Sequence, residues 1–186
     1  YAEGPDGTWS IVGDVLHASG ISGSTAFGMS LSLSADGRVL AVGDRYATLN
    51  GNQTKVGSIR MFRQENATWE ILGEKIHGQQ ANDFFGWSVA LSQDGLRVAA
   101  SAIGSNDQKG EVRIFDFIGG AWVQLGSNLV GEAERENFGA SLAMDKNGTF
   151  LAIGANGYSK GGTASSVGRV LTYQYDDQTK DWIPLS

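Results

Sequence analysis

An 18-residue segment that occurs three times in phase constrains the fold of this chain more than any other feature. The copies begin at Phe27, Phe85 and Phe138 and align without a gap, as FGMSLSLSADGRVLAVGD, FGWSVALSQDGLRVAASA and FGASLAMDKNGTFLAIGA. Each copy has two short runs of alternating β-forming residues around an Asp-Gly or Asn-Gly pair, where the Gly accepts the positive φ of a tight turn. Each copy therefore predicts a β-hairpin, and the repetition predicts a repeat architecture.

Two further elements recur with the same period. Tryptophans spaced by 60, 53 and 60 residues each open a W-x-x-apolar segment, and they are Trp9, Trp69, Trp122 and Trp182. The segments GSIRMF, GEVRIF and GRVLTY begin 30, 25 and 30 residues after their Phe-Gly pair. Each unit thus predicts four strands: two in the hairpin, a third that ends in the aromatic residue, and a fourth that starts at Trp. The difference in length falls in the loop between the second and third strands, where a repeat fold tolerates variation.

Four-stranded antiparallel units of about 50 residues are typical of β-propeller blades. We expect an all-β fold with three blades, at about residues 27–73, 85–126 and 138–185, after the tail of a preceding blade at residues 1–13. Tyr1 aligns with the last aromatic residue of a third strand. Closed propellers typically have about four to eight blades, so we expect a partial propeller or a part of a larger one. The remaining blades would come from flanking sequence, or from a second copy of the chain in a symmetric ring.

Composition and charge exclude several classes of function. The net charge is −6 and the 14 basic residues are scattered, whereas nucleic-acid binding needs clustered Lys and Arg. The chain has no cysteine, so it forms no disulfide, thiolate zinc site or cysteine nucleophile. No apolar run approaches the roughly 18 residues of a membrane span. High Gly content, with 27 residues, suits many short strands joined by tight turns.

The repeat resembles the FG-GAP repeats of integrin α-subunit propellers and related surface proteins. Phe27-Gly28, Phe85-Gly86 and Phe138-Gly139 carry the FG half. The GAP half is carried loosely by VGD at 42–44, SA at 101–102 and IGA at 153–155, without a proline in any unit. The resemblance covers nearly the whole chain and implies a non-catalytic propeller that mediates adhesion or other protein binding.

Such blades often carry a calcium loop, D-x-[DN]-x-D-G-x-x-D, between their first two strands. Calcium requires six to eight oxygen ligands, but no unit here retains more than two plausible ones, and the last position is always apolar, at Leu40, Val98 or Leu151. We therefore expect plain hairpin turns, and neither a metal nor a cofactor. His17 and His77 align with Val130, so we expect a packing or edge role for them. Asp176, Asp177 and Asp181 are expected to solvate a turn.

The function predicted is that of an interaction or structural module, which binds a protein partner or the other blades. A carbohydrate-binding propeller, or the accessory module of a larger enzyme, is the alternative. Because no nucleophile–base set recurs, we expect no enzyme activity in this chain. Propellers bind through loops, and the loops between strands two and three share a face with the links between blades. The candidate contacts there are Arg45, Tyr46, Asn50, Asn82, Asp83, Asn106, Asp107, Arg135, Glu136, Tyr158 and Lys160.

Three N-x-[ST] sequons begin at Asn52, Asn66 and Asn147, each in a predicted connection. A glycan is carried on such surface loops in secreted proteins. The sequons favour an extracellular or cell-surface location and a glycosylated protein.

Overall fold

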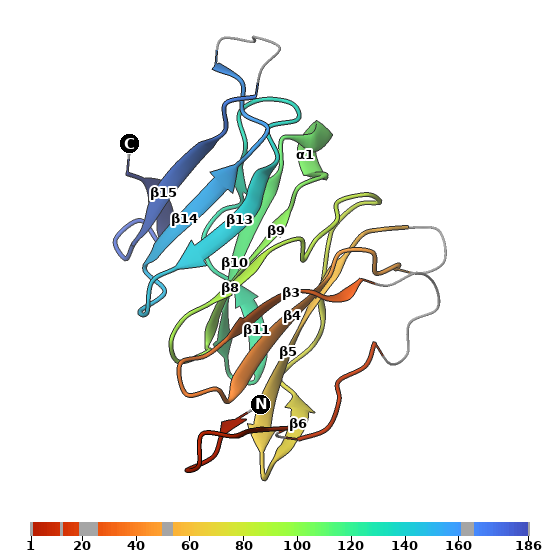
Figure 1. The fold of residues 1–186 in the computed structure, drawn as a ribbon. Helices are drawn as coiled ribbons and strands as arrows, with labels where there is room; N and C mark the ends of the chain where they lie inside the picture. Colours follow the sequence, from red (N-terminus) through yellow and green to blue (C-terminus); the bar gives the residue numbers. More distant parts are fainter. Residues whose placement is uncertain (1, 12, 19–25, 50–53, 161–165, 186) are drawn as a thin grey trace.

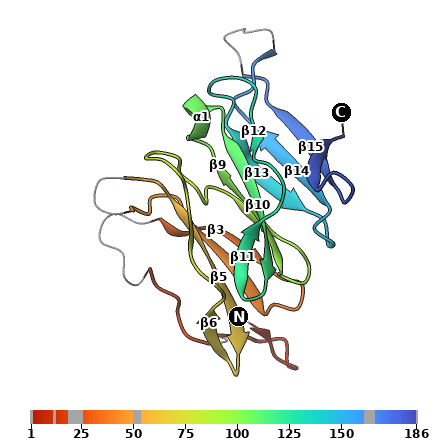
Figure 2. The same ribbon diagram turned by 180° about the vertical axis from the view of Figure 1, so that it is seen from behind.

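The computed structural model contains three antiparallel four-stranded sheets that fan out side by side (Figures 1 and 2). It describes residues 2–11, 13–18, 26–49, 54–160 and 166–185.

Blade one consists of β3 (Phe27–Leu33), β4 (Val39–Asp44), β5 (Ser58–Glu65) and β6 (Thr68–Ile71), with β7 (Ile76–His77) also paired to β5. Blade two consists of β8 (Val89–Leu91), β9 (Arg97–Ala102), β10 (Glu111–Ile118) and β11 (Ala121–Gln124), with β12 (Leu129–Val130) also paired to β10. Blade three consists of β13 (Phe138–Met144), β14 (Phe150–Ala155), β15 (Arg169–Asp176) and β16 (Asp181–Pro184).

This architecture confirms the all-β, partial-propeller prediction, with the strands in each blade ordered as in the sequence. The α-helix assigned in the described part of the chain is α1 (Ser105–Gln108), a single turn in which Asn106 and Asp107 have left-handed backbone angles. No described helix has the length and apolar character needed to cross a membrane.

The N-terminal residues form a two-stranded ribbon of β1 (Ala2–Glu3) and β2 (Trp9–Ser10). Its register pairs Glu3 with Trp9, just as Phe117 pairs with Trp122 between the third and fourth strands of blade two. The ribbon therefore has the register of a third–fourth strand pair. It lies beside β6 at the lower end of Figure 1.

The hydrophobic core lies between blades, in two layers. In the first layer, Ile59 and Met61 of blade one pack with Val89, Val98 and Phe115 of blade two. In the second layer, side chains of β10 and β12 pack with those of β14, β15 and β16. This layer includes Val112, Ile114, Leu129, Leu151, Ile153, Tyr173 and Trp182. A sheet of four strands buries each face only against a neighbouring blade, so the blades depend on one another for their stability.

Within each blade, the Phe of the Phe-Gly pair meets the aromatic residue of the third strand edge to face. The ring centroids lie 6.2–6.5 Å apart and the interplanar angles are 77–85°. This is a favourable arrangement for aromatic quadrupoles, and it explains why both residues recur at fixed positions. The pairs are Phe27–Phe62, Phe85–Phe115 and Phe138–Tyr173.

The repeat tryptophans of blades two and three join each blade to the one before it. Trp122 Nε1 donates a hydrogen bond to the Leu72 carbonyl oxygen at 2.8 Å, and Trp182 Nε1 donates to the Leu125 carbonyl oxygen at 3.3 Å. The indole packs on the glycine that follows the acceptor, and a Cβ built at Gly73 would lie 2.8 Å from Trp122 Cδ1. Gly73 also has a φ of 73°, and it interrupts the fourth strand between β6 and β7. We call this contact the Trp joint.

Polar contacts reinforce the same boundaries. Ser30 Oγ donates to the Gly86 carbonyl at 2.8 Å, and Ser32 Oγ accepts from the Leu91 N–H at 2.9 Å. Between blades two and three, Asp181 accepts hydrogen bonds from both the N–H and the hydroxyl of Ser127, each at 2.8 Å. Small Ser side chains on the first strand thus let neighbouring backbones approach and still satisfy their polar groups.

We predict that Trp122→Ala lowers the free energy of unfolding by about 3 kcal/mol, because it removes a large ring from an interblade contact. Trp9→Ala is the matched control, since Trp9 occupies the equivalent repeat position but is 65% exposed. The control should change stability by less than about 0.5 kcal/mol. Urea denaturation followed by circular dichroism measures both, and equal midpoints for the two variants would contradict the joint.

Candidate functional site

The strand order gives the fan two edges lined by connections. The loops between second and third strands, including α1, and the links from one blade to the next form one edge, which we call the loop face. The turns that connect the first strand to the second, and the third strand to the fourth, form the other edge, which we call the hairpin face. In Figure 1, α1 lies at the upper end of the fan, away from β6.

Two buried carboxylates shape the links between blades. Asp83 Oδ2 accepts hydrogen bonds from the backbone N–H groups of Gln79 and Gln80, each at 2.8 Å. Glu136 Oε2 accepts the equivalent bonds from Glu132 and Ala133 at 2.8 and 2.9 Å. Asp83 is 5% exposed and Glu136 is fully buried. The structure therefore revises the expectation that these two side chains contact a partner, because their carboxylates hold the links in shape.

Where blades one and two meet, the loop face carries a group of rings and cations that we call the aromatic–cation cluster (Arg45, Tyr46, Lys55, Phe84 and Trp87). The Arg45 guanidinium lies 4.3 Å from the Trp87 ring centroid and 4.8 Å from that of Tyr46. Phe84 meets Tyr46 and Trp87 edge to face, with centroids 6.1 and 6.4 Å apart. Lys55 Nζ lies 5.9 Å from the Tyr46 ring and 6.0 Å from the Phe84 ring. Lys55 is exposed and the other members are half-buried.

Phe84 also lines a cavity of about 480 Å³ on the loop face. The cavity brings together four of the predicted contacts, Asn82, Asp83, Asn106 and Asp107, and its remaining polar lining consists of amide side chains. Left-handed backbone is concentrated around it, at Asn82, Phe84, Asn106, Asp107, Gln108 and Asn137. For Phe84 this conformation is strained, and it turns the ring toward the cluster.

The other predicted contacts lie on the third blade's side of the loop face or outside the described residues. Arg169 is 2.6 Å from Glu136 Oε1 and 4.2 Å from the Tyr158 ring centroid, so Tyr158 is engaged in packing. Although burial opposes it, hydrogen bonds from Arg169 to Glu136 and Glu132 raise the guanidinium pKa. Arg135 and Lys160 are exposed. Asn50 and the sequon at Asn52 lie outside the described residues.

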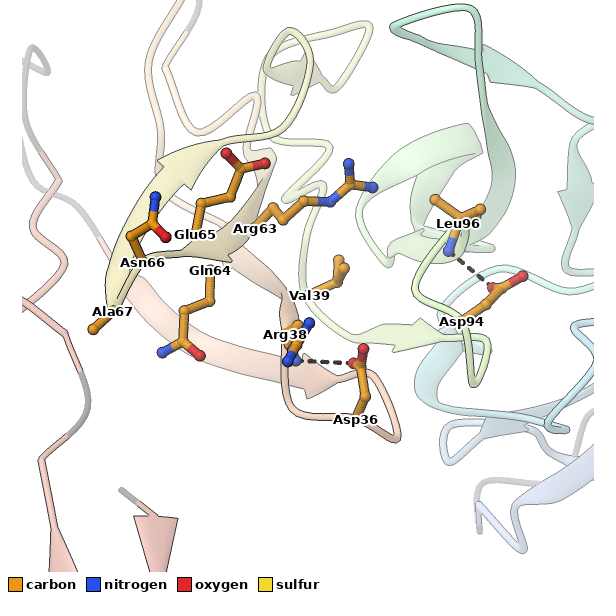
Figure 3. A pocket seen from close by; sticks show the side chains of 10 residues that line it. All are labelled: Asp36, Arg38, Val39, Arg63, Gln64, Glu65, Asn66, Ala67, Asp94 and Leu96. Carbon is orange, nitrogen blue, oxygen red and sulfur yellow. Dashed lines mark hydrogen bonds between the residues drawn. The ribbon is translucent and has the colours of Figure 1, made fainter.

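The hairpin face holds a second cavity, of about 680 Å³, between blades one and two (Figure 3). Arg63 extends from β5 toward the blade-two residues Leu96 and Asp94, and its guanidinium lies 6.0 Å from the Phe117 ring centroid. Asp36 and Asp94 each accept a backbone hydrogen bond within their own turn, at 3.0 Å. The carboxylates of Asp36 and Asp94 thus stabilise their own turns, and the cavity as a whole is lined by charges of both signs.

The residues aligned with a calcium loop form closed hairpin turns. Asp145 accepts hydrogen bonds from the backbone N–H groups of Asn147, Thr149 and Phe150 at 2.6–3.1 Å. Partial burial works against ionisation, but these hydrogen bonds lower the pKa of Asp145 below its ordinary value of 3.8. In the first two units a Ser and an Asp share this role through Ser34 Oγ–Asp36 and Ser92 Oγ–Asp94 bonds of 2.7 and 2.6 Å.

The remaining titratable candidates are the two histidines and the three aspartates near the last Trp. The His77 carbonyl accepts a hydrogen bond from Arg113 at 2.9 Å, and burial together with Lys75 and Arg60 lowers the pKa of the His77 imidazole. His17 is exposed. Asp176 accepts the Gln178 N–H at 2.9 Å, and Asp177 pairs with Lys180 at 3.3 Å, whereas Asp181 bonds across to blade two. No group of three or more potential metal ligands occurs in the described part of the chain.

Sequence reasoning missed Phe84, Trp87 and Lys55. Trp87 aligns with Met29 and Ala140, and Phe84 aligns with Asn137, so neither recurs in the repeat. The signal that could have identified Phe84 and Trp87 is a departure from the repeat. Each is an aromatic residue at a position where the other units have small, aliphatic or polar residues.

We predict that millimolar calcium leaves the thermal midpoint unchanged, because the turn carboxylates are already occupied by backbone N–H groups. A metal that binds the folded state alone must raise the midpoint by mass action. Differential scanning calorimetry with calcium and then with a chelator checks this. A rise that the chelator reverses would contradict it, and Asp145→Asn would show whether the third unit is responsible.

Comparison with known proteins agrees with this geometry. Residues 78–115, which run from the link between blades one and two to the middle of β10, match the FG-GAP repeat family. No curated protein matches the sequence. The structure is similar to that of a candidate 6-phosphogluconolactonase from Bacteroides uniformis, with a TM-score of 0.60 and 13% identity over 98% of this chain and 48% of that one. TolB from Acinetobacter baumannii gives a TM-score of 0.44 and 15% identity, over 87% of this chain and 32% of TolB.

The chain spans about half the length of the Bacteroides protein, and the likeness to that protein concerns the fold alone. The chain thus has the fold of a partial β-propeller, in which residues 78–115 match the FG-GAP repeat family.

Proposed function

We propose that the chain is a non-catalytic interaction module of an extracellular or cell-surface propeller, which binds a protein partner through its loop face. The observation that carries the proposal is the aromatic–cation cluster. Trp, Tyr and Arg dominate binding energy at protein interfaces, and Trp87, Tyr46 and Arg45 lie together here with part of each side chain accessible. The adjoining amide-lined cavity supplies hydrogen-bonding groups beside these rings.

The outward faces of blades one and three support the proposal that this chain is part of a larger propeller. Val89 and Leu91 of β8 pack against blade one and are 6% and 8% exposed. The equivalent residues of β3, Leu31 and Leu33, are 59% and 55% exposed. A blade placed before blade one would cover them as blade one covers β8.

The opposite end face has the same character. Val170 of β15 is 71% exposed, whereas its equivalent in blade two, Val112, is fully buried against blade three. The exposed face of β3 corresponds to a face that is buried in blade two, and so does the exposed face of β15. Further blades of a longer protein are therefore the occupants that fit these two faces best. Residues 1–13 then belong to the blade before blade one, in keeping with the strand register of the ribbon.

The lining of the cavities supports a non-catalytic role. Neither the loop-face cavity nor the hairpin-face cavity is lined by a serine, histidine or lysine. A Ser–His or Ser–Lys pair is therefore missing from both linings, and Asp36, Asp83 and Asp94 accept hydrogen bonds from backbone N–H groups. The lactonase assignment of the Bacteroides structure does not transfer at 13% identity, because one fold supports many functions.

The extracellular part of the proposal rests on the sequons. Asn66 and Asn147 are exposed and lie in the turns after β5 and β13. Both side chains therefore have room for a glycan.

The partner assignment is tested by capturing secreted proteins of the source organism on the immobilised chain and identifying them by mass spectrometry. We expect Tyr46→Ala to reduce capture of the specific partner by about tenfold or more. Arg63→Ala, on the hairpin face, is the matched control and should capture as the wild type does. Capture that is unaffected by Tyr46→Ala, or lost equally in both folded variants, would contradict binding through the loop face.

A further inference from the structure

We propose that the aromatic–cation cluster binds the side-chain carboxylate of an acidic residue in a peptide segment of the protein partner. The inference rests on the proposed function for the existence of that partner. It adds the chemistry of the group that the loop face recognises and assigns Arg45 as the residue that receives it.

Two cations of the cluster have no anionic partner within the described structure. No carboxylate of a described residue forms an ion pair with Arg45 or Lys55 within 4.0 Å. The Arg45 Nε atom is buried without a hydrogen-bond acceptor. The guanidinium is held instead by its faces, over the Trp87 and Tyr46 rings. Ring stacking covers the faces of a guanidinium, and the two terminal nitrogens, Nη1 and Nη2, can still bind a carboxylate bidentately in the plane of the group.

Other arginines of this fold show the completed arrangement. Arg169 lies 4.2 Å from the Tyr158 ring centroid, and its Nε atom donates a hydrogen bond to Glu136 Oε1 at 2.6 Å. Arg97 stacks at 5.3 Å on Tyr175, and its Nε atom lies 2.6 Å from Asp116 Oδ1. In both cases a ring covers the guanidinium face and a carboxylate meets its edge. Arg45 has the rings alone, and because its Nε atom is buried, an external carboxylate would meet the terminal Nη1 and Nη2 atoms instead.

The surroundings favour a peptide as the source of that carboxylate. Phe84 belongs to both the cluster and the neighbouring cavity, so a segment that binds Arg45 and continues across the Phe84 ring would meet the cavity. The amides of Asn82 and Asn106 can both donate to and accept from a peptide backbone. Asp107 also lines the cavity and repels additional negative charge. The site therefore fits a segment with a single acidic residue better than a run of them.

The probe is the peptide acetyl-Gly-Asp-Gly-amide, titrated into the isotope-labelled chain and followed by the indole N–H signal of Trp87 in two-dimensional NMR. Acetyl-Gly-Asn-Gly-amide removes the charge with almost no change in shape, and acetate supplies the carboxylate without a peptide. We expect the Asp peptide to shift the Trp87 signal saturably and to bind at least about tenfold more tightly than either control.

The variants locate the binding. Arg45→Gln should weaken the Asp peptide by about tenfold or more, whereas Arg38→Gln, at the hairpin-face cavity, should leave its affinity unchanged. Because Arg45 also packs on two rings, Lys55→Gln provides a second variant that alters only an exposed side chain, and we expect it to weaken binding about threefold.

Equal binding of the Asp and Asn peptides, or no effect of either loop-face variant, would overturn the carboxylate site. Acetate that binds as tightly as the Asp peptide would overturn the peptide assignment. If the peptide fails while capture of the partner still depends on Tyr46, the proposed function stands and this inference alone falls.

Discussion

The Trp joint is the contact on which the rest of this structure depends. Trp122 donates its indole N–H to the Leu72 carbonyl and fills the space beside Gly73, and Trp182 repeats the contact at Leu125. A four-stranded blade buries its faces only against other blades, so a contact that fixes their spacing also fixes the two core layers. The loops then emerge in register along one face, and the aromatic–cation cluster forms where two blades meet.

The fold could be predicted from the sequence because several independent features repeat with one period. Phe-Gly pairs, Asp-Gly turns and third-strand aromatics each give a weak signal, but their common phase leaves few architectures. The division of the fourth strand at Gly73 was not predicted. Gly73 contacts Trp122, 49 residues further along the chain, and local patterns carry no information on such a contact.

The candidate site was less predictable because it does not repeat. Arg45 and Tyr46 could be placed on the loop face from topology, whereas Phe84 and Trp87 occur in one unit and look like substitutions at packing positions. Asp83 and Glu136 resembled surface charges, yet both are buried caps of the interblade links. A charged residue in a predicted loop has two outcomes, contact with solvent or satisfaction of nearby backbone N–H groups, and the sequence does not distinguish them.

Hydrogen exchange of the indole N–H groups, measured by NMR, tests the central claim most directly, namely that the Trp joint holds neighbouring blades together. A hydrogen-bonded indole between blades exchanges only when the joint opens, whereas an exposed one exchanges freely. We expect strong protection of the Trp122 and Trp182 indole protons and none for Trp9, which is 65% exposed. Exchange of Trp122 as rapid as that of Trp9 would contradict it.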